Sequence, residues 1–141
     1  METSARNTFS GTVTAVTSSA VQSEVVITTA SGNQIVTTIT NNSRDRLGIA
    51  VGKKATALVK ALFVMLEKAA EPSPTSARNA FAGTVTGTIA DEVVTEVNGT
   101  LQDGTPVCAV ITTASAKKLG VEKGAKFIFF FKAPSPILVM D

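Results

Sequence analysis

The chain has 141 residues, and its 13 lysines and arginines against 11 aspartates and glutamates give a formal net charge of +2. Hydrophobic residues make up 44% of the sequence, which is enough for a packed core. The positive and negative charges are nearly balanced, and this balance does not predict a surface that binds nucleic acid or membranes. With no His and one Cys, the sequence excludes His-dependent nucleophilic catalysis, His-ligated metal sites, internal disulfides and Cys-cluster metal sites.

The sequence shows neither a secretory signal nor a membrane-spanning run. Its first residues lack a basic region followed by an apolar segment. The longest apolar stretches, 55–66 and 127–140, are interrupted by Lys60 and Lys132 and are shorter than the roughly 20 residues that a bilayer requires. We therefore expect a soluble cytoplasmic protein with no membrane partner.

An internal repeat organises the chain. The pentapeptide Thr3–Asn7 recurs unchanged as Thr75–Asn79, and a gapless comparison of residues 3–67 with 75–139 gives 25 identities in 65 pairs. The segment 68–74 between the copies contains two prolines, which predicts a short, stiff linker. We expect two domains of one kind, 3–67 and 75–141, joined by the linker 68–74.

The first half of each repeat reads as β-strands. Residues Phe9–Val16 alternate apolar and small polar side chains, as a half-buried strand does. Val21–Thr29 and Gln34–Thr40 are rich in Val, Ile and Thr, and the turn signal Ser31–Asn33 separates them. The sequence therefore predicts a long strand followed by a hairpin.

A short helix is expected next, over Thr40–Gly48. Thr, Asn and Ser at its start are N-cap residues, and Gly48 is a typical helix stop. After it, Val51–Lys53 forms a turn into another strand.

The end of each repeat gives conflicting signals that the repeat itself resolves. Ala55–Ala70 favours a helix by propensity, but its partner segment, Phe127–Asp141, contains Pro134 and Pro136, which break helices. Because gapless copies share a fold, we predict two short strands separated by a bend in both. The expected fold class is all-β: two tandem OB-like Greek-key β-barrels, each of about five strands plus one short helix.

A set of polar residues is kept at identical spacing in both copies. It supplies cations, hydroxyl donors and amides, with no acid among its members, and such a donor-only set suits a small dianion. It offers no metal ligands and no catalytic base. The members are Arg6, Asn7, Thr40, Ser43 and Lys60, with Arg78, Asn79, Thr112, Ser115 and Lys132.

Structural explanations stand beside this one. Each residue alone is more simply a helix cap, a solvated arm or a surface lysine, and repeats also share residues through common ancestry. The Phe127–Phe131 run could stack nucleic-acid bases, but Leu58 and Val59 occupy matched places, which favours a core role. Cys108 replaces Val36, which favours a buried apolar position.

A series of motifs follows in order along the first copy: S-A-R-N, F-S-G-T-V, A-V-Q-S-E-V, T-N-N-S, L-G-I-A-V-G-K and V-K-A-L-F-V-M-L, found at Ser4–Asn7, Phe9–Val13, Ala20–Val25, Thr40–Ser43, Leu47–Lys53 and Val59–Leu66. Together these motifs resemble the molybdate- and tungstate-binding Mop, or molbindin, domain. The resemblance covers nearly the whole chain, and the two copies are similar to the tandem di-Mop arrangement.

The resemblance implies intracellular molybdate storage or homeostasis by a homotrimer of two-domain chains, with the oxyanion as ligand and no organic cofactor. It places general sites between domains and axial sites on the threefold axis. The axial sites would use backbone groups of Ala20, Val21, Gln22, Val93 and Val94. The general sites would use Ser4, Arg6, Asn7, Thr40, Ser43 and Lys60, with Ser76, Arg78, Asn79, Thr112, Ser115 and Lys132.

The second copy departs from the family pattern at two places. Glu92 stands where the first copy has Ala20, and an acid near an anion site repels the ligand. Pro134 and Pro136 follow Lys132, so the bend after that lysine differs in sequence from the bend after Lys60.

Two other functions remain as alternatives. A nucleic-acid-binding tandem OB module would need exposed aromatics and a cationic groove, yet aromatics are 5% of the chain. A molybdate-responsive regulatory protein would share the same sites and add a partner. An enzyme is not expected, because the sequence has no His and no retained acid pair.

Overall fold

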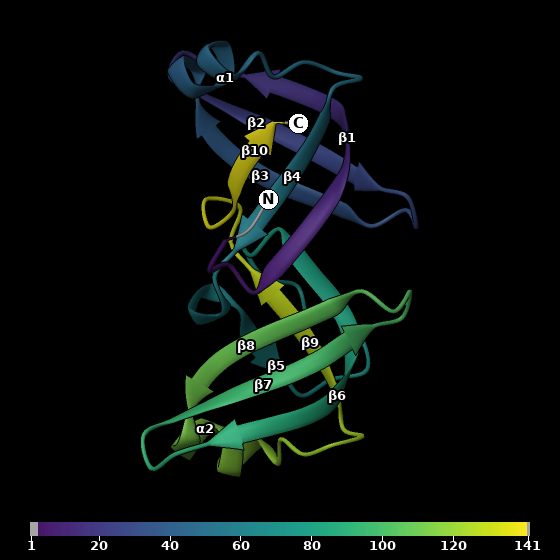
Figure 1. Ribbon diagram of the computed structural model, residues 1–141, viewed down its shortest axis with the longest axis vertical. Helices are drawn as coiled ribbons and strands as arrows, with labels where there is room; N and C mark the ends of the chain where they lie inside the picture. Colours follow the sequence, from purple (N-terminus) through teal and green to yellow (C-terminus); the bar gives the residue numbers. More distant parts are fainter. Residues whose placement is uncertain (1–2, 141) are drawn as a thin grey trace.

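The computed structural model describes residues 3–140. Two five-stranded antiparallel sheets, each curled and each accompanied by a short helix, lie one above the other along the long axis (Figure 1). The elements are β1 (Asn7–Ser18), β2 (Gln22–Thr29), β3 (Gln34–Thr40), α1 (Asn41–Leu47), β4 (Lys54–Val59), the 3₁₀ turn η1 (Ala61–Phe63), β5 (Met65–Glu67), β6 (Asn79–Ala90), β7 (Val94–Leu101), β8 (Pro106–Thr112), α2 (Thr113–Leu119), β9 (Lys126–Phe131) and β10 (Ile137–Met140). The all-β prediction is confirmed, including the two short strands at the end of each repeat.

The two repeats exchange their last strands. The sheet orders are β10-β4-β1-β2-β3 and β5-β9-β6-β7-β8. Strand β10, from the second repeat, pairs with β4 of the first, with Ile137 opposite Leu58. Strand β5 makes the reciprocal pairing with β9, with Met65 opposite Phe130. We call the sheet that contains β1 the first barrel and the sheet that contains β6 the second barrel.

Each barrel is filled by the alternating inward side chains of its strands. On β4 these are Ala55, Ala57 and Val59, and on β9 they are Phe127, Phe129 and Phe131, all buried. The larger Phe129 ring is accommodated because the second copy has Gly99 where the first has Ile27; a Cβ on Gly99 would lie 2.7 Å from the ring. The volume is redistributed between strands, so one backbone packs both sequences.

Each helix begins and ends where the sequence predicts. The Thr40 side chain accepts a hydrogen bond from the Ser43 N–H at 3.1 Å, and Gly48 ends α1 in the left-handed conformation at φ 67°. Thr112, Ser115 and Gly120 repeat this arrangement around α2. No helix among residues 3–140 is long and apolar enough to cross a membrane.

Aromatic rings and backbone hydrogen bonds join the barrels at the waist of the molecule. The rings of Phe9, Phe81 and Phe131 form a cluster with centroids 6.0–6.2 Å apart. The Thr38 N–H donates to the Ala133 carbonyl at 3.0 Å, which attaches the β9–β10 connection to the edge of the first barrel. Because Phe127, Phe129 and Phe131 are buried, the aromatic run forms core and not an exposed platform for bases.

Candidate oxyanion-binding site

The two retained arginines reach from one barrel to the other. Arg6 precedes β1 and donates to the Glu96 carboxylate and to Asn98 Oδ1, at 3.3 Å, on β7. Arg78 precedes β6 and donates to Glu24 on β2, with distances of 2.7 and 3.3 Å to the two carboxylate oxygens. Both arginines are about half exposed, so each still presents guanidinium N–H groups to solvent.

The Arg6–Glu96 pair fixes the charge state of both groups. The hydrogen bond that Arg6 donates to Glu96 lowers the pKa of the Glu96 carboxyl and raises the pKa of the Arg6 guanidinium. Glu24 and Glu96, which are the same residue type at equivalent positions of the repeats, therefore hold the arginines in place.

The two retained asparagines are buried, and each binds the backbone of the opposite barrel, while Asn7 also binds a carbonyl of its own barrel. The Asn7 amide donates to the Val59 carbonyl at 3.1 Å and to the Cys108 carbonyl at 2.9 Å, and it accepts from the Cys108 N–H at 2.7 Å. Asn79 makes the equivalent pair with Val36, both bonds at 2.7 Å. These amides connect β1 to β8 and β6 to β3.

Lys60 and Ser4 line one pocket at the waist. Its volume is about 300 Å³, and its wall also includes Phe63, Ser135 and Ile137. The tight turn of η1 begins at Lys60, whose carbonyl accepts a hydrogen bond from the Phe63 N–H at 3.0 Å.

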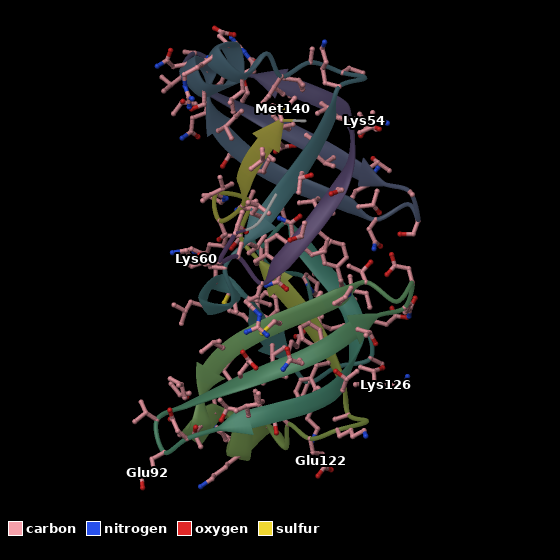
Figure 2. All side chains as sticks on the ribbon, in the orientation of Figure 1. Lys54, Lys60, Glu92, Glu122, Lys126 and Met140 are labelled. Carbon is pink, nitrogen blue, oxygen red and sulfur yellow. The ribbon has the colours of Figure 1, made fainter. Side chains whose placement is uncertain are left out.

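The equivalent turn of the second repeat begins at Lys132, whose carbonyl accepts a hydrogen bond from the Ser135 N–H at 3.0 Å. Both lysines are exposed, as are Ser4 and Ser76. Figure 2 shows Lys60 at the side of the waist, pointing to solvent.

The retained hydroxyl pairs lie away from these lysines within one chain. Thr40 donates to Ser43 Oγ at 3.0 Å, and Thr112 donates to Ser115 Oγ at 2.8 Å. Helices α1 and α2 sit at opposite ends of the long axis, whereas Lys60 lies at the waist (Figures 1 and 2). One chain thus groups Ser4 with Lys60 but leaves the hydroxyl pair of α1 apart from them.

The two turns expected to form axial sites differ in their hydrogen bonds. In the first repeat Ala20, Val21 and Gln22 are exposed; the Val21 N–H has no hydrogen-bond partner within residues 3–140, and the Gln22 N–H meets Ser19 Oγ at 3.4 Å. In the second repeat an acid, Asp91, stands at the position of Ser19.

There the Asp91 carboxylate accepts from the Val93 and Val94 N–H groups at 2.7 and 2.8 Å. These are the two backbone donors that the resemblance assigned to the axial site of the second repeat. Glu92 beside them is exposed at the end of the second barrel (Figure 2).

A polar cluster near the first turn was missed by the sequence analysis. Arg44 Nη1 donates to Ser18 Oγ at 2.6 Å, to Ser23 Oγ at 3.1 Å and to Asn41 Oδ1 at 3.3 Å. The second repeat has Ala116 in place of Arg44, so a search for residues kept in both copies could not find this cluster.

The donor set suits an anion better than a cation. Within the described part of the chain, no group of three or more His, Cys, Asp or Glu residues could hold a metal ion. The exposed groups that gather at the waist are guanidinium, ammonium and hydroxyl, which donate hydrogen bonds to an oxyanion.

The chain is similar to a known protein family and to several curated relatives. The TOBE domain family matches it twice, over residues 3–66 and 75–138. The molybdenum-pterin-binding protein MopA of Rhodobacter capsulatus is 39% identical over 140 residues, covering 99% of this chain and 53% of MopA. The molybdenum transport protein ModE of Azotobacter vinelandii is 40% identical over 141 residues, covering 99% of this chain and 52% of ModE. The chain spans about half the length of these relatives.

Solved structures extend the likeness to the whole fold. The cytoplasmic molybdate-binding protein ModG, in a form with molybdate bound, aligns with a TM-score of 0.95 at 36% identity. The alignment covers 100% of both chains, so the tandem arrangement of the two repeats is shared as well.

Proposed function

The chain belongs to the TOBE domain family, and from this premise we propose that it is a cytoplasmic protein that binds and stores molybdate. The observation that carries the proposal is the full-length likeness to ModG, a cytoplasmic molybdate-binding protein, at 36% identity. The similarity to MopA, which is named for binding molybdenum-pterin, also supports a ligand that contains molybdenum. Tungstate, a dianion of the same shape and charge, is expected to bind the same donors.

The general sites of the first repeat would use Ser4, Arg6, Thr40, Ser43 and Lys60. Arg6 and Lys60 would neutralise the dianion, while hydroxyl and backbone N–H groups donate to its oxygens. Glu96 and Asn98 each take one N–H of Arg6, so its remaining donors are available to a ligand. The second repeat would use Ser76, Arg78, Thr112, Ser115 and Lys132 in the same roles.

A complete site would require more than one chain. The α1 hydroxyls and Lys60 are separated within one copy, as described above, and an oxyanion spanning both must lie between copies. Exposed apolar side chains surround the waist near the Lys60 pocket, which suits an interface between copies. They are Leu62, Phe63, Met65 and Ile137. We propose a homotrimer, and a ligand that binds only the assembled form would stabilise it.

A second candidate is the ligand-responsive part of a regulator. The DNA-binding transcriptional dual regulator ModE of Escherichia coli (strain K12) is 32% identical over 139 residues, and the chain covers 52% of it. The two functions share the oxyanion site and differ in whether the loaded protein acts on a further partner.

Titration calorimetry with molybdate tests the proposal, on protein whose mass in solution is fixed by light scattering. We expect a trimer that binds molybdate tightly and binds sulfate and phosphate much more weakly. Absence of binding by the assembled protein would refute the proposed function.

Two substitutions test the proposed residues. Arg6→Ala and Lys60→Ala should each weaken molybdate binding by at least about tenfold, because each removes a charged hydrogen-bond donor from the dianion. Lys123→Ala, at an exposed turn, is the control for lost charge. Glu96→Gln breaks the Arg6 ion pair but keeps the guanidinium, so it should bind at least as tightly as the parent. Unchanged binding by both alanine variants would contradict the site assignment.

A further inference from the structure

The turns at the two ends of the molecule differ in one residue that bears directly on anion binding. Ser19 and Asp91 occupy equivalent positions in the repeats. The Ser19 hydroxyl approaches the Gln22 N–H only at 3.4 Å and leaves the Val21 N–H unpaired within the described residues. The Asp91 carboxylate accepts short hydrogen bonds from both equivalent N–H groups.

A carboxylate in this position does what a bound oxyanion would do. It places negative charge and one acceptor oxygen, Oδ1, in front of two successive backbone donors. The hydrogen bonds from the Val94 and Val93 N–H groups lower the pKa of the Asp91 carboxyl, so this group is ionised at neutral pH. An external anion would have to displace it and would also meet the neighbouring Glu92.

The first turn has no acid at these positions and has a cation beside it. Arg44 lies against this turn through its hydrogen bonds to Ser18 and Ser23, with its side chain only 24% exposed, and its Nε also donates to the Asp45 carboxylate at 2.9 Å. Asn41 fixes the turn further by donating to the Ser19 carbonyl at 2.8 Å. The equivalent residues in the second repeat are Ala116 in place of Arg44 and Thr113 in place of Asn41, and neither carries a charge.

We propose that Asp91 is a built-in carboxylate that occupies the backbone donors of the second-repeat turn and closes that end to oxyanions. The first-repeat turn, with Ser19 in place of the acid and Arg44 beside it, stays open. This inference rests on the proposed function and assigns Asp91 as the residue that decides which end of the molecule takes an ion.

Exchange of the two residues tests the proposal. Molybdate stoichiometry is measured by calorimetry and by molybdenum analysis of desalted protein, with the mass of each variant fixed by light scattering. Asp91→Ser should gain a class of sites that the parent lacks, and Ser19→Asp should lose one. The double variant should return to the parental number. Glu122→Ser, another exposed acid of the second repeat, removes the same charge away from the turn and should change nothing.

Asp91→Asn distinguishes two ways in which Asp91 could exclude an anion: by occupying the backbone donors or by charge repulsion alone. It also serves as a variant in which the turn is expected to stay folded. Its amide oxygen can still accept from the two N–H groups, so the turn keeps its shape while the charge is lost. We expect this variant to stay closed. A gain in Asp91→Asn equal to that in Asp91→Ser would overturn donor occupancy, and unchanged stoichiometry in Asp91→Ser and Ser19→Asp would overturn the assignment altogether. A parent protein that binds no molybdate would refute the proposed function itself, which is a different result.

Discussion

At the scale of single residues, the most consequential side chains at the waist are two amides. Asn7 and Asn79 are each about 1% exposed and each bind backbone groups of the opposite barrel. Buried polar groups cost free energy unless they are hydrogen-bonded, and these are. Their identical placement in both repeats is therefore explained by a structural connection between the barrels.

Asn7→Ala should lower the free energy of unfolding by about 1–3 kcal/mol, because it removes the side chain that binds both the buried N–H and the buried carbonyl of Cys108. Denaturant titration of the variant measures the loss. Asn42→Ala is the matched control, since Asn42 lies exposed on α1. Equal stability of both variants would contradict the connecting role of Asn7.

This residue also shows how far repeat comparison can go. Retention at equal spacing selected Asn7 together with the proposed anion ligands Arg6, Ser43 and Lys60, because a connecting amide and a proposed anion ligand are both polar residues kept in both copies. Only the three-dimensional contacts separate the two roles. The Arg44 cluster occurs in one repeat alone, so selecting residues that are kept in both repeats leaves it out.

At the scale of elements, local chemistry accounts for most of what the sequence predicts. The α1 boundaries follow from Thr40 at the N-cap and Gly48 at the C-terminus, and both signals lie within a few residues of each other. The contact between the β2–β3 and β7–β8 turns is different. Ser31 and Asn33 donate to the Asp103 carboxylate across 70–72 residues, which no local pattern reveals.

The Asp103 contact predicts a pH-dependent contribution to stability. Hydrogen bonds from Ser31 and then from Thr105 lower the pKa of the Asp103 carboxyl below its unfolded value. The contribution is therefore present above the unfolded pKa and is lost as pH falls through the lowered pKa of the folded state. Asp103→Asn should be less stable than the parent at pH 7, by less than about 1 kcal/mol because the group is exposed.

Thermal unfolding of both proteins between neutral and acidic pH checks this sign. The difference in Tm should shrink as pH falls and vanish once Asp103 is protonated in the folded parent. A difference that grows in acid would show that the carboxylate destabilises the contact. Glu122→Gln, which removes an exposed acid of the same barrel that accepts no side-chain hydrogen bond within residues 3–140, is the matched control.

At the scale of the whole molecule, the repeats are held together by exchange of strands. Strand β10 completes the first barrel and β5 completes the second. This exchange is invisible in the sequence, because equivalent strands from either copy make equivalent local contacts. The repeat therefore predicts five strands per barrel but not which copy supplies the fifth.

The exchange predicts that the two repeats remain associated after the chain is cut between them. A protease site inserted between Glu71 and Pro72 lies in an exposed part of the linker and interrupts no strand. After cleavage, the halves should run as a single particle in size-exclusion chromatography under native conditions, because each would have to give up a paired strand to leave. They should separate only in denaturant.

A variant of the cleavable protein tests whether strand β10 holds the two halves together. Leu138→Asp places a charge on a buried position of β10, opposite Ala57 of β4, and should weaken the pairing of that strand with the first barrel. In the uncut chain the linker still keeps the halves together, so circular dichroism of that form reports whether the variant folds. After cleavage its halves should separate at lower denaturant than those of the parent. If the parental halves separate without denaturant, the exchanged strands do not hold the molecule together, and the linker does.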